Sequence, residues 1–384
     1  MTHPSVAAKP RFRFDRNELA GAFGDIGTDL PLIVGMVLAA GLDAASALIM
    51  FGVMQYMTAV RYGMPMAVQP LKAMAVIVIT QKIAGPTLFG AGLAIGLVML
   101  ILTASGTLAW LARVVPKSVV RGLQLGLGLQ LTVLALGNYV RAEGITGYGL
   151  ALIAFAIALA LFGNRRFPPA LPIIGLGIVY AFVFNLDLRD LRDGFGFALP
   201  LLRAPSASDV WTGFVILALP QIPLSLGNSL LATRQTAHDL FPEKGVTIRR
   251  LGYTYSLMNL VNPWFGGIPT CHGSGGLMGH YTFGARTGGS LVIYGSIFLV
   301  LGLFFSAAFG EVVHVFPLPV LGVLLAFEGW ALMWLARDMV PVPRELAITI
   351  AVALLAVLAP YGYVLGLLLG TFAWYAIVKS RGAT

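Results

Sequence analysis

The sequence predicts an all-α membrane protein with fourteen transmembrane segments, arranged as two inverted repeats of seven spans each. Three observations support this prediction: an apolar composition, continuous apolar runs of bilayer length, and pieces of the first half that recur in the second. Hydrophobic residues fill 58% of the 384 positions and charged residues only 11%. A soluble domain is about 45–50% apolar and roughly 25% charged, so lipid must be the solvent for most of this chain.

The apolar runs decide between the two structures that can span a bilayer. A spanning segment must satisfy its own backbone hydrogen bonds, which only helices and closed barrels do. The runs here are continuous and do not alternate at every second residue, which excludes a barrel. Windows of about 20 residues give fourteen segments, with approximate centres at Leu30, Val53, Ile77, Met99, Gly128, Phe155, Gly177, Leu219, Tyr255, Leu277, Phe298, Leu325, Val352 and Leu368.

The basic residues agree with this count and place both termini in the cytoplasm. Of the 25 lysines and arginines, eighteen fall on the side of the N-terminus and five on the other, and Lys72 and Arg121 lie inside spans. The positive-inside rule predicts such an asymmetry for a multi-pass protein of the cell (inner) membrane. The net charge of +9 therefore reflects topology, and we expect no nucleic-acid partner.

Internal similarity divides the chain into two halves. With a shift of 204 residues Gly63-Met64-Pro65 falls on Gly267-Ile268-Pro269, and with a shift of 200 residues Val120 and Gly122 fall on Val320 and Gly322. Seven spans per half give the halves opposite orientations, as in many secondary transporters. We expect a cytoplasmic N-terminal segment (1–18), a first inverted repeat (19–186), a polar connector (187–209) and a second inverted repeat (210–384).

Each half contains a segment with too many glycines and prolines for a regular helix, over residues 63–72 and 266–276. We predict a short extended stretch, at Met66–Val68 in the first half, followed by a half-helix in each case (spans 3 and 10). Pro70 suits the first helical turn, and Gly273 or Ser274 suits the N-cap of the second half-helix. The alternative is that these glycines only permit close helix packing.

Two helix N-termini that meet in mid-membrane would present backbone N–H groups and positive dipole ends, which bind anions. Gln69 and Ser274 are the strongest side-chain candidates, because neutral donors can replace hydration without trapping the ion. The full set of substrate-binding candidates lies at the helix starts and in a polar stretch of span eight: Gln69, Pro70, Lys72, Asn228, Cys271, His272, Gly273, Ser274 and Gly275.

Charged side chains within spans are costly and point to a function. Asp25, Asp29 and Glu328 are candidates for proton coupling, because protonation would carry compensating charge with an anion that enters against the membrane potential. The aspartates could equally buttress a broken helix. Lys72 could bind the anion or pair with Asp25 or Asp29, and pairing is the favoured interpretation. His272 could carry a proton or serve as a structural donor.

No pattern indicates catalysis, a metal site or a cofactor. The sequence lacks a nucleophile elbow, an HExxH motif and a phosphate loop. Its single cysteine, Cys271, has no disulfide partner and no metal-ligand spacing around it. We therefore do not expect an enzyme.

Three motifs carry a family resemblance. They are Gly24-Asp25-Ile26-Gly27-Thr28, Ala67-Val68-Gln69-Pro70-Leu71-Lys72, and Pro269-Thr270-Cys271-His272-Gly273-Ser274-Gly275-Gly276-Leu277 followed by Phe283-Gly284-Ala285-Arg286-Thr287. They resemble the GDLGT, PVQPMK and PxCHGAGGL…RFGART segments of the molybdate transporter family related to the sulfate permeases. The chain departs from these segments at Ala67 (for Pro), Leu71 (for Met), Ser274 (for Ala) and Thr282 (for Arg).

The resemblance implies the fold of uracil and sulfate permeases, in which core and gate subdomains move past each other in an elevator-like cycle. It implies an oxyanion substrate, most often molybdate, between the two half-helices, and it leaves proton coupling and a homodimer open. The alternatives are a sulfate or tungstate transporter, an uncoupled anion exchanger or channel, and a nucleobase permease.

Overall fold

The computed structural model describes residues 10–164, 168–184, 195–309 and 316–379. Regular structure in these ranges is almost entirely helical. Most of the first half of the expected connector lies outside the described residues. So do six basic residues used in the topology prediction: Lys9, Arg165, Arg166, Arg189, Arg192 and Arg381.

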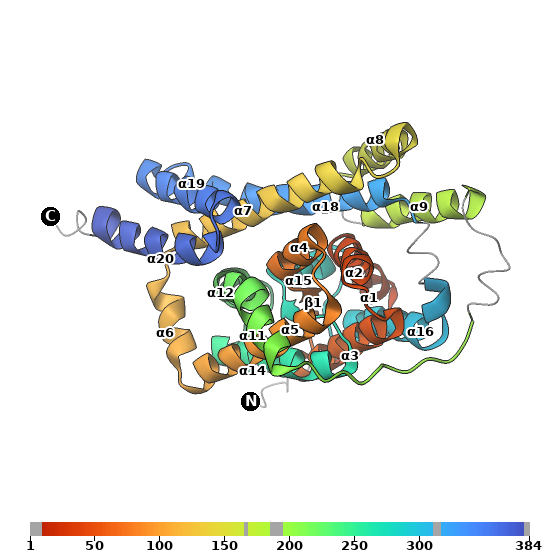
Figure 1. Cartoon of the computed structure of the whole chain (residues 1–384), viewed down its shortest axis with the longest axis horizontal. Helices are drawn as coiled ribbons and strands as arrows, with labels where there is room; N and C mark the ends of the chain where they lie inside the picture. Colours follow the sequence, from red (N-terminus) through yellow and green to blue (C-terminus); the bar gives the residue numbers. More distant parts are fainter. Residues whose placement is uncertain (1–9, 165–167, 185–194, 310–315, 380–384) are drawn as a thin grey trace, which may run out of the picture.

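The helices form two layers (Figure 1). Both halves of the chain contribute to each layer, and α6 (Thr107–Val114) connects them. The core layer contains α1 (Arg16–Ala22), α2 (Ile26–Ala40), α3 (Ala44–Tyr62), α4 (Lys72–Gln81), α5 (Gly85–Ala104), α11 (Ala207–Gly213), α12 (Leu219–Leu224), α13 (Thr233–Leu240), α14 (Ile248–Val261), α15 (Ser274–Thr282) and α16 (Gly289–Phe304). The cover layer contains α7 (Lys117–Leu134), α8 (Gly144–Ala160), α9 (Ala170–Phe184), α18 (Leu318–Trp334), α19 (Pro343–Leu358) and α20 (Gly362–Trp374).

Packing within each layer follows the same division. In the core layer α3 packs on α16, and α5 packs on α11 and α14. In the cover layer α7 packs on α18 and α19. The layers touch where α18 meets α2 and where α7 and α20 meet α12. Helices that are far apart in the sequence thus pack together within each layer.

The helical membrane fold that the composition predicts is confirmed, and each of the fourteen predicted centres lies within a helix. By length and composition alone, five described helical stretches could cross a membrane: Arg16–Ala40, Gly85–Ala104, Lys117–Tyr139, Ala207–Leu240 and Leu318–Met339. Five further apolar helices are shorter. The number of fourteen crossings therefore stays a prediction.

Two short strands lie in the middle of the core layer, one in each glycine- and proline-rich segment. β1 (Val68–Pro70) pairs antiparallel with β2 (Thr270–His272), with Gln69 opposite Cys271. Each strand leads into a short helix, α4 or α15, and the two helix starts are 202 residues apart (274 − 72 = 202). This spacing lies between the two shifts of 200 and 204 residues found in the sequence.

The position of Pro70 differs from the prediction. Pro70 ends β1, opposite Thr270, and α4 begins only at Lys72. A residue before a proline is biased towards extended backbone, and pairing with β2 continues that conformation; the Leu71 amide then donates to the Pro269 carbonyl at 3.1 Å. The extended stretch therefore runs later than the predicted Met66–Val68.

The helices after the expected connector include a distorted span. α11 begins at Ala207, where Ser206 and Asp209 form a capping box. Further along, α12 carries a proline in its interior, Pro223, and passes into a π-helical segment at Ser225–Ala232. Such segments are rare and occur often at functional sites.

Candidate functional site

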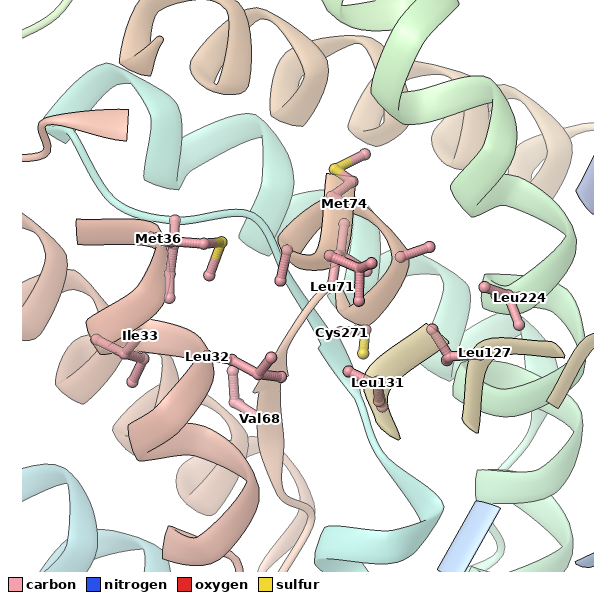
Figure 2. Packing of buried hydrophobic residues seen from close by; sticks show 14 of the residues in the cluster. Leu32, Ile33, Met36, Val68, Leu71, Met74, Leu127, Leu131, Leu224 and Cys271 are labelled. Carbon is pink, nitrogen blue, oxygen red and sulfur yellow. The ribbon is translucent and has the colours of Figure 1, made fainter. Parts of the chain in front are cut away.

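The strand pair and the starts of α4 and α15 lie in one buried cluster at the centre of the molecule. Figure 2 shows Val68, Leu71 and Cys271 among side chains of four surrounding helices. These side chains are Leu32, Ile33 and Met36 of α2, Met74 of α4, Leu127 and Leu131 of α7, and Leu224 of α12. Apolar side chains from both layers therefore surround the polar groups described next.

Gln69 and Asp25 form the first polar contact of the site. The Gln69 amide nitrogen Nε2 donates to both carboxylate oxygens of Asp25, at 2.8 and 2.7 Å. Both side chains lie against the start of α15: a Cβ on Gly273 would overlap the Gln69 carboxamide, and a Cβ on Gly276 would overlap Asp25. Three predicted residues from distant segments are thus brought together, and the glycines are required by their close approach.

The N-terminus of α15 is uncapped and partly open. Its N-cap is Gly273, and no side chain caps the helix. A Cβ on Gly275 would meet nothing within 4 Å, and Gly275 is exposed. No side chain therefore caps the first turn of α15, and open space lies beside Gly275 at this helix start, as an anion-binding site would need.

Asn228 links α15 to the cover layer. Its side-chain oxygen is 3.4 Å from the Ser274 hydroxyl and accepts from Gln124 Nε2 at 3.2 Å. Arg121 donates to Gln124 at 2.9 Å and makes a two-pronged contact with Asp338. Arg121 therefore pairs with a carboxylate near the edge of the cover layer, and it reaches the helix start only through other side chains. No motif or pattern in the sequence singles out Gln124.

The N-terminus of α4 differs from the prediction of free N–H groups. Gln221 Oε1 accepts from the amides of Ala73 and Met74, at 3.0 and 3.2 Å. Ser225 lies 3.3 Å from Gln221 Nε2 and 2.7 Å from the hydroxyl of Tyr255. A neutral carboxamide oxygen thus occupies the position that an anion would take at this helix. In the sequence, the only sign of this cap is a glutamine that lies between Pro220 and Pro223 in an apolar run.

Lys72 pairs with Glu328 of α18, a partner in the other layer. The second oxygen of this carboxylate accepts from the Thr28 hydroxyl at 3.0 Å. The expected partners are engaged elsewhere: Asp25 accepts from Gln69, and Asp29 accepts from the hydroxyl of Tyr294 at 3.1 Å. The interpretation of Lys72 as an ion-pair residue holds, but Asp25 and Asp29 were the wrong partners.

His272 and Cys271 lie on opposite sides of β2, because side chains alternate along a strand. His272 Nε2 is 2.6 Å from the Thr254 hydroxyl, and its ring packs edge-on against Tyr62. Cys271 lies in the apolar cluster and is 2% exposed. These contacts favour the structural interpretation of His272. Among the described residues, no group of three or more His, Cys, Asp or Glu is placed to hold a metal.

A cavity of about 450 Å³ lies between the layers, next to this site. Gly24, Gly27, Thr28 and Phe283 line it from the core layer, and residues of α9 and α18, including Glu328, line it from the cover layer. Gln69 and Ser274 are not among its lining residues. The cavity therefore reaches the Glu328–Thr28 contact and stops there.

The fold resembles that of solved anion transporters. The transmembrane domain of the cyanobacterial bicarbonate transporter BicA matches with a TM-score of 0.67 and 18% identity, over 91% of this chain and 97% of that one. The murine Solute Carrier 26 family member A9 anion transporter, in the inward-facing state, matches with a TM-score of 0.72 and 12% identity, over 97% of this chain and 70% of that one.

Sequence comparison is more specific. The family described as "Molybdate transporter of MFS superfamily" matches residues 17–131 and 213–332. Molybdate transporter 1 of Arabidopsis thaliana is 34% identical over 374 residues, which cover 85% of this chain and 81% of the relative. Molybdate transporter 2 of the same plant is 33% identical, over 84% and 79%. The chain is therefore a membrane-spanning member of the molybdate transporter family.

Proposed function

We propose that this protein is a secondary transporter that imports a tetrahedral oxyanion, molybdate in the first place, bound at the N-terminus of α15. The observation that carries the proposal is the uncapped first turn of α15, beside Gly275 and its open space. Two relatives that cover most of the chain are named molybdate transporters, which supports molybdate as the cargo.

The chemistry of the helix start favours an oxyanion. Backbone amides of the first turn can each donate to an oxygen of a tetrahedral anion, and the helix dipole adds a positive end. Of the two helices, α15 is the better binder in this conformation, because Gln221 already accepts from the amides of α4. Lys72 supplies a full positive charge at the start of α4.

The architecture is consistent with alternating access by movement of one layer past the other. Both halves of the chain contribute to both layers (Figure 1), as expected if fourteen spans form two inverted repeats. The substrate site belongs to the core layer, which would carry it past the cover layer. We propose that the transporter lies in the cell (inner) membrane with both termini in the cytoplasm.

The function is tested by uptake into proteoliposomes. We expect saturable uptake of radiolabelled molybdate at micromolar concentration. Unlabelled tungstate should compete strongly, because it has nearly the same size and charge, and sulfate should compete less. Absence of molybdate uptake at these concentrations would refute molybdate as the cargo, and stronger uptake of sulfate would make the protein a sulfate transporter of the same fold.

Proton coupling is expected to act through Asp25, which touches Gln69 and lies against Gly276 at the proposed site. Moving a dianion into a cell costs about 2.3 kcal/mol per charge at 100 mV, and co-transported protons offset this cost. Asp25→Asn should remove the stimulation of molybdate uptake by an inward proton gradient, while molybdate–molybdate exchange continues. Asp239→Asn, at an exposed aspartate of α13, is the matched control. If the proton gradient does not change uptake by the wild type, the protein is better described as an uncoupled exchanger.

A further inference from the structure

The ion pair between Lys72 and Glu328 is a polar bridge between the two layers. Lys72 begins α4 in the core layer, and Glu328 lies in the cover-layer helix α18. Thr28 of α2, also in the core layer, donates to the other oxygen of the same carboxylate. One carboxylate of the cover layer thus holds two elements of the core layer.

Breaking this bridge in an empty site would separate two charges in a poorly hydrated place. The Lys72 side chain is 4% exposed and that of Glu328 is 15% exposed. A charge that is buried without a partner is strongly unfavourable. The conformation in which the pair is closed is therefore stabilised as long as no other anion can take the place of the carboxylate at Lys72.

A bound dianion would change this balance. Lys72 and Glu328 carry opposite charges, and a bound dianion would add two negative charges beside them. The oxyanion would attract Lys72 and repel Glu328. Because Glu328 lines the cavity of about 450 Å³, its carboxylate has space in which to be hydrated once it leaves Lys72.

We propose that Glu328 is a substrate-sensitive latch: it holds the core layer in this conformation while the site is empty, and the oxyanion opens it by taking over Lys72. Glu328 is thus a positioning residue that makes movement of the core layer depend on cargo. The inference rests on the proposed function, because it needs an oxyanion bound at the start of α15.

The test compares net uptake with exchange in proteoliposomes. Glu328→Gln removes the charge but keeps the shape, so the empty site should return more easily. We expect the ratio of net molybdate uptake to molybdate–molybdate exchange to rise at least about threefold, and tungstate binding to purified protein to tighten about tenfold, because a competing carboxylate is gone. Glu345→Gln, the same change in α19 of the cover layer, should leave both quantities unchanged.

If Glu328 has a purely structural role, Glu328→Gln should lower net uptake and exchange in parallel, and this result would contradict the latch. An unchanged ratio of net uptake to exchange, with unchanged tungstate affinity, would contradict it as well. Glu328→Asp keeps the charge, so its ratio of net uptake to exchange should equal that of the wild type, even if Glu328→Gln folds poorly. A threefold rise of this ratio in Glu328→Asp would also contradict the proposal. If the wild type itself neither binds tungstate nor exchanges molybdate, the proposed function fails, which is a separate outcome.

Discussion

Replacement of Ser274 by aspartate is expected to reduce molybdate uptake about 100-fold or more, because a carboxylate near a bound dianion in a poorly hydrated site is strongly repulsive. Ser274 is the first residue of α15, where an acidic side chain favours the helix. The variant should therefore fold normally. The measurements are initial uptake rates in proteoliposomes and the melting temperature of the purified protein.

The matched control is Ser274→Ala. The Ser274 hydroxyl is 3.4 Å from Asn228, a weak contact, and we propose that backbone amides carry most of the binding. Uptake by Ser274→Ala should therefore stay within about threefold of the wild type. A larger loss in Ser274→Ala than in Ser274→Asp would show that the hydroxyl matters and that charge at this helix start does not.

Gly273→Ala is expected to reduce uptake by about tenfold to 100-fold and to lower the free energy of unfolding by about 1–3 kcal/mol. The Gly273 backbone is extended, at φ −118° and ψ 124°, so alanine can adopt it. The new Cβ, however, would overlap the Gln69 carboxamide and push it away from Asp25. Uptake assays and chemical or thermal unfolding of the purified protein measure the two effects.

Two further variants separate overpacking from function. Gly149→Ala in α8 places a Cβ where nothing lies within 4 Å, and it should change neither uptake nor stability appreciably. Combining Gly273→Ala with Gln69→Ala removes the Gln69 carboxamide that the new Cβ would overlap, so this overlap is relieved while uptake should stay low. Recovery of uptake in this double variant would mean that Gln69 has no role in transport.

Features with a local cause could be predicted from the sequence. The apolar runs required helices in lipid, and the glycines and prolines around Gln69 and Gly273 required breaks in the helices. The sequence predicted an extended stretch before each half-helix, but it did not predict that the two stretches pair as strands. The position of Pro70 was wrong because a tertiary contact, the pairing with Thr270, extends the strand past the point where local preference would begin the helix.

Features that depend on contacts between distant segments could not be predicted. Asp25 and Asp29 were the predicted partners of Lys72, and the sequence does not tell that Glu328 pairs with it instead. Glu328 reaches Lys72 because α18 packs against α2 across the two layers. The cap that Gln221 provides for α4 has the same origin, since 148 positions separate Gln221 from Ala73.

The central claim is that the start of α15, beside Gln69, binds the oxyanion. A structure of the protein with tungstate tests it most directly, because the heavy atom gives a strong anomalous signal in a crystal. We expect one dominant anomalous peak within hydrogen-bonding distance of the backbone amides in the first turn of α15, next to Gln69 and Gly275. A site fully occupied by tungstate elsewhere, with this helix start empty, would contradict it.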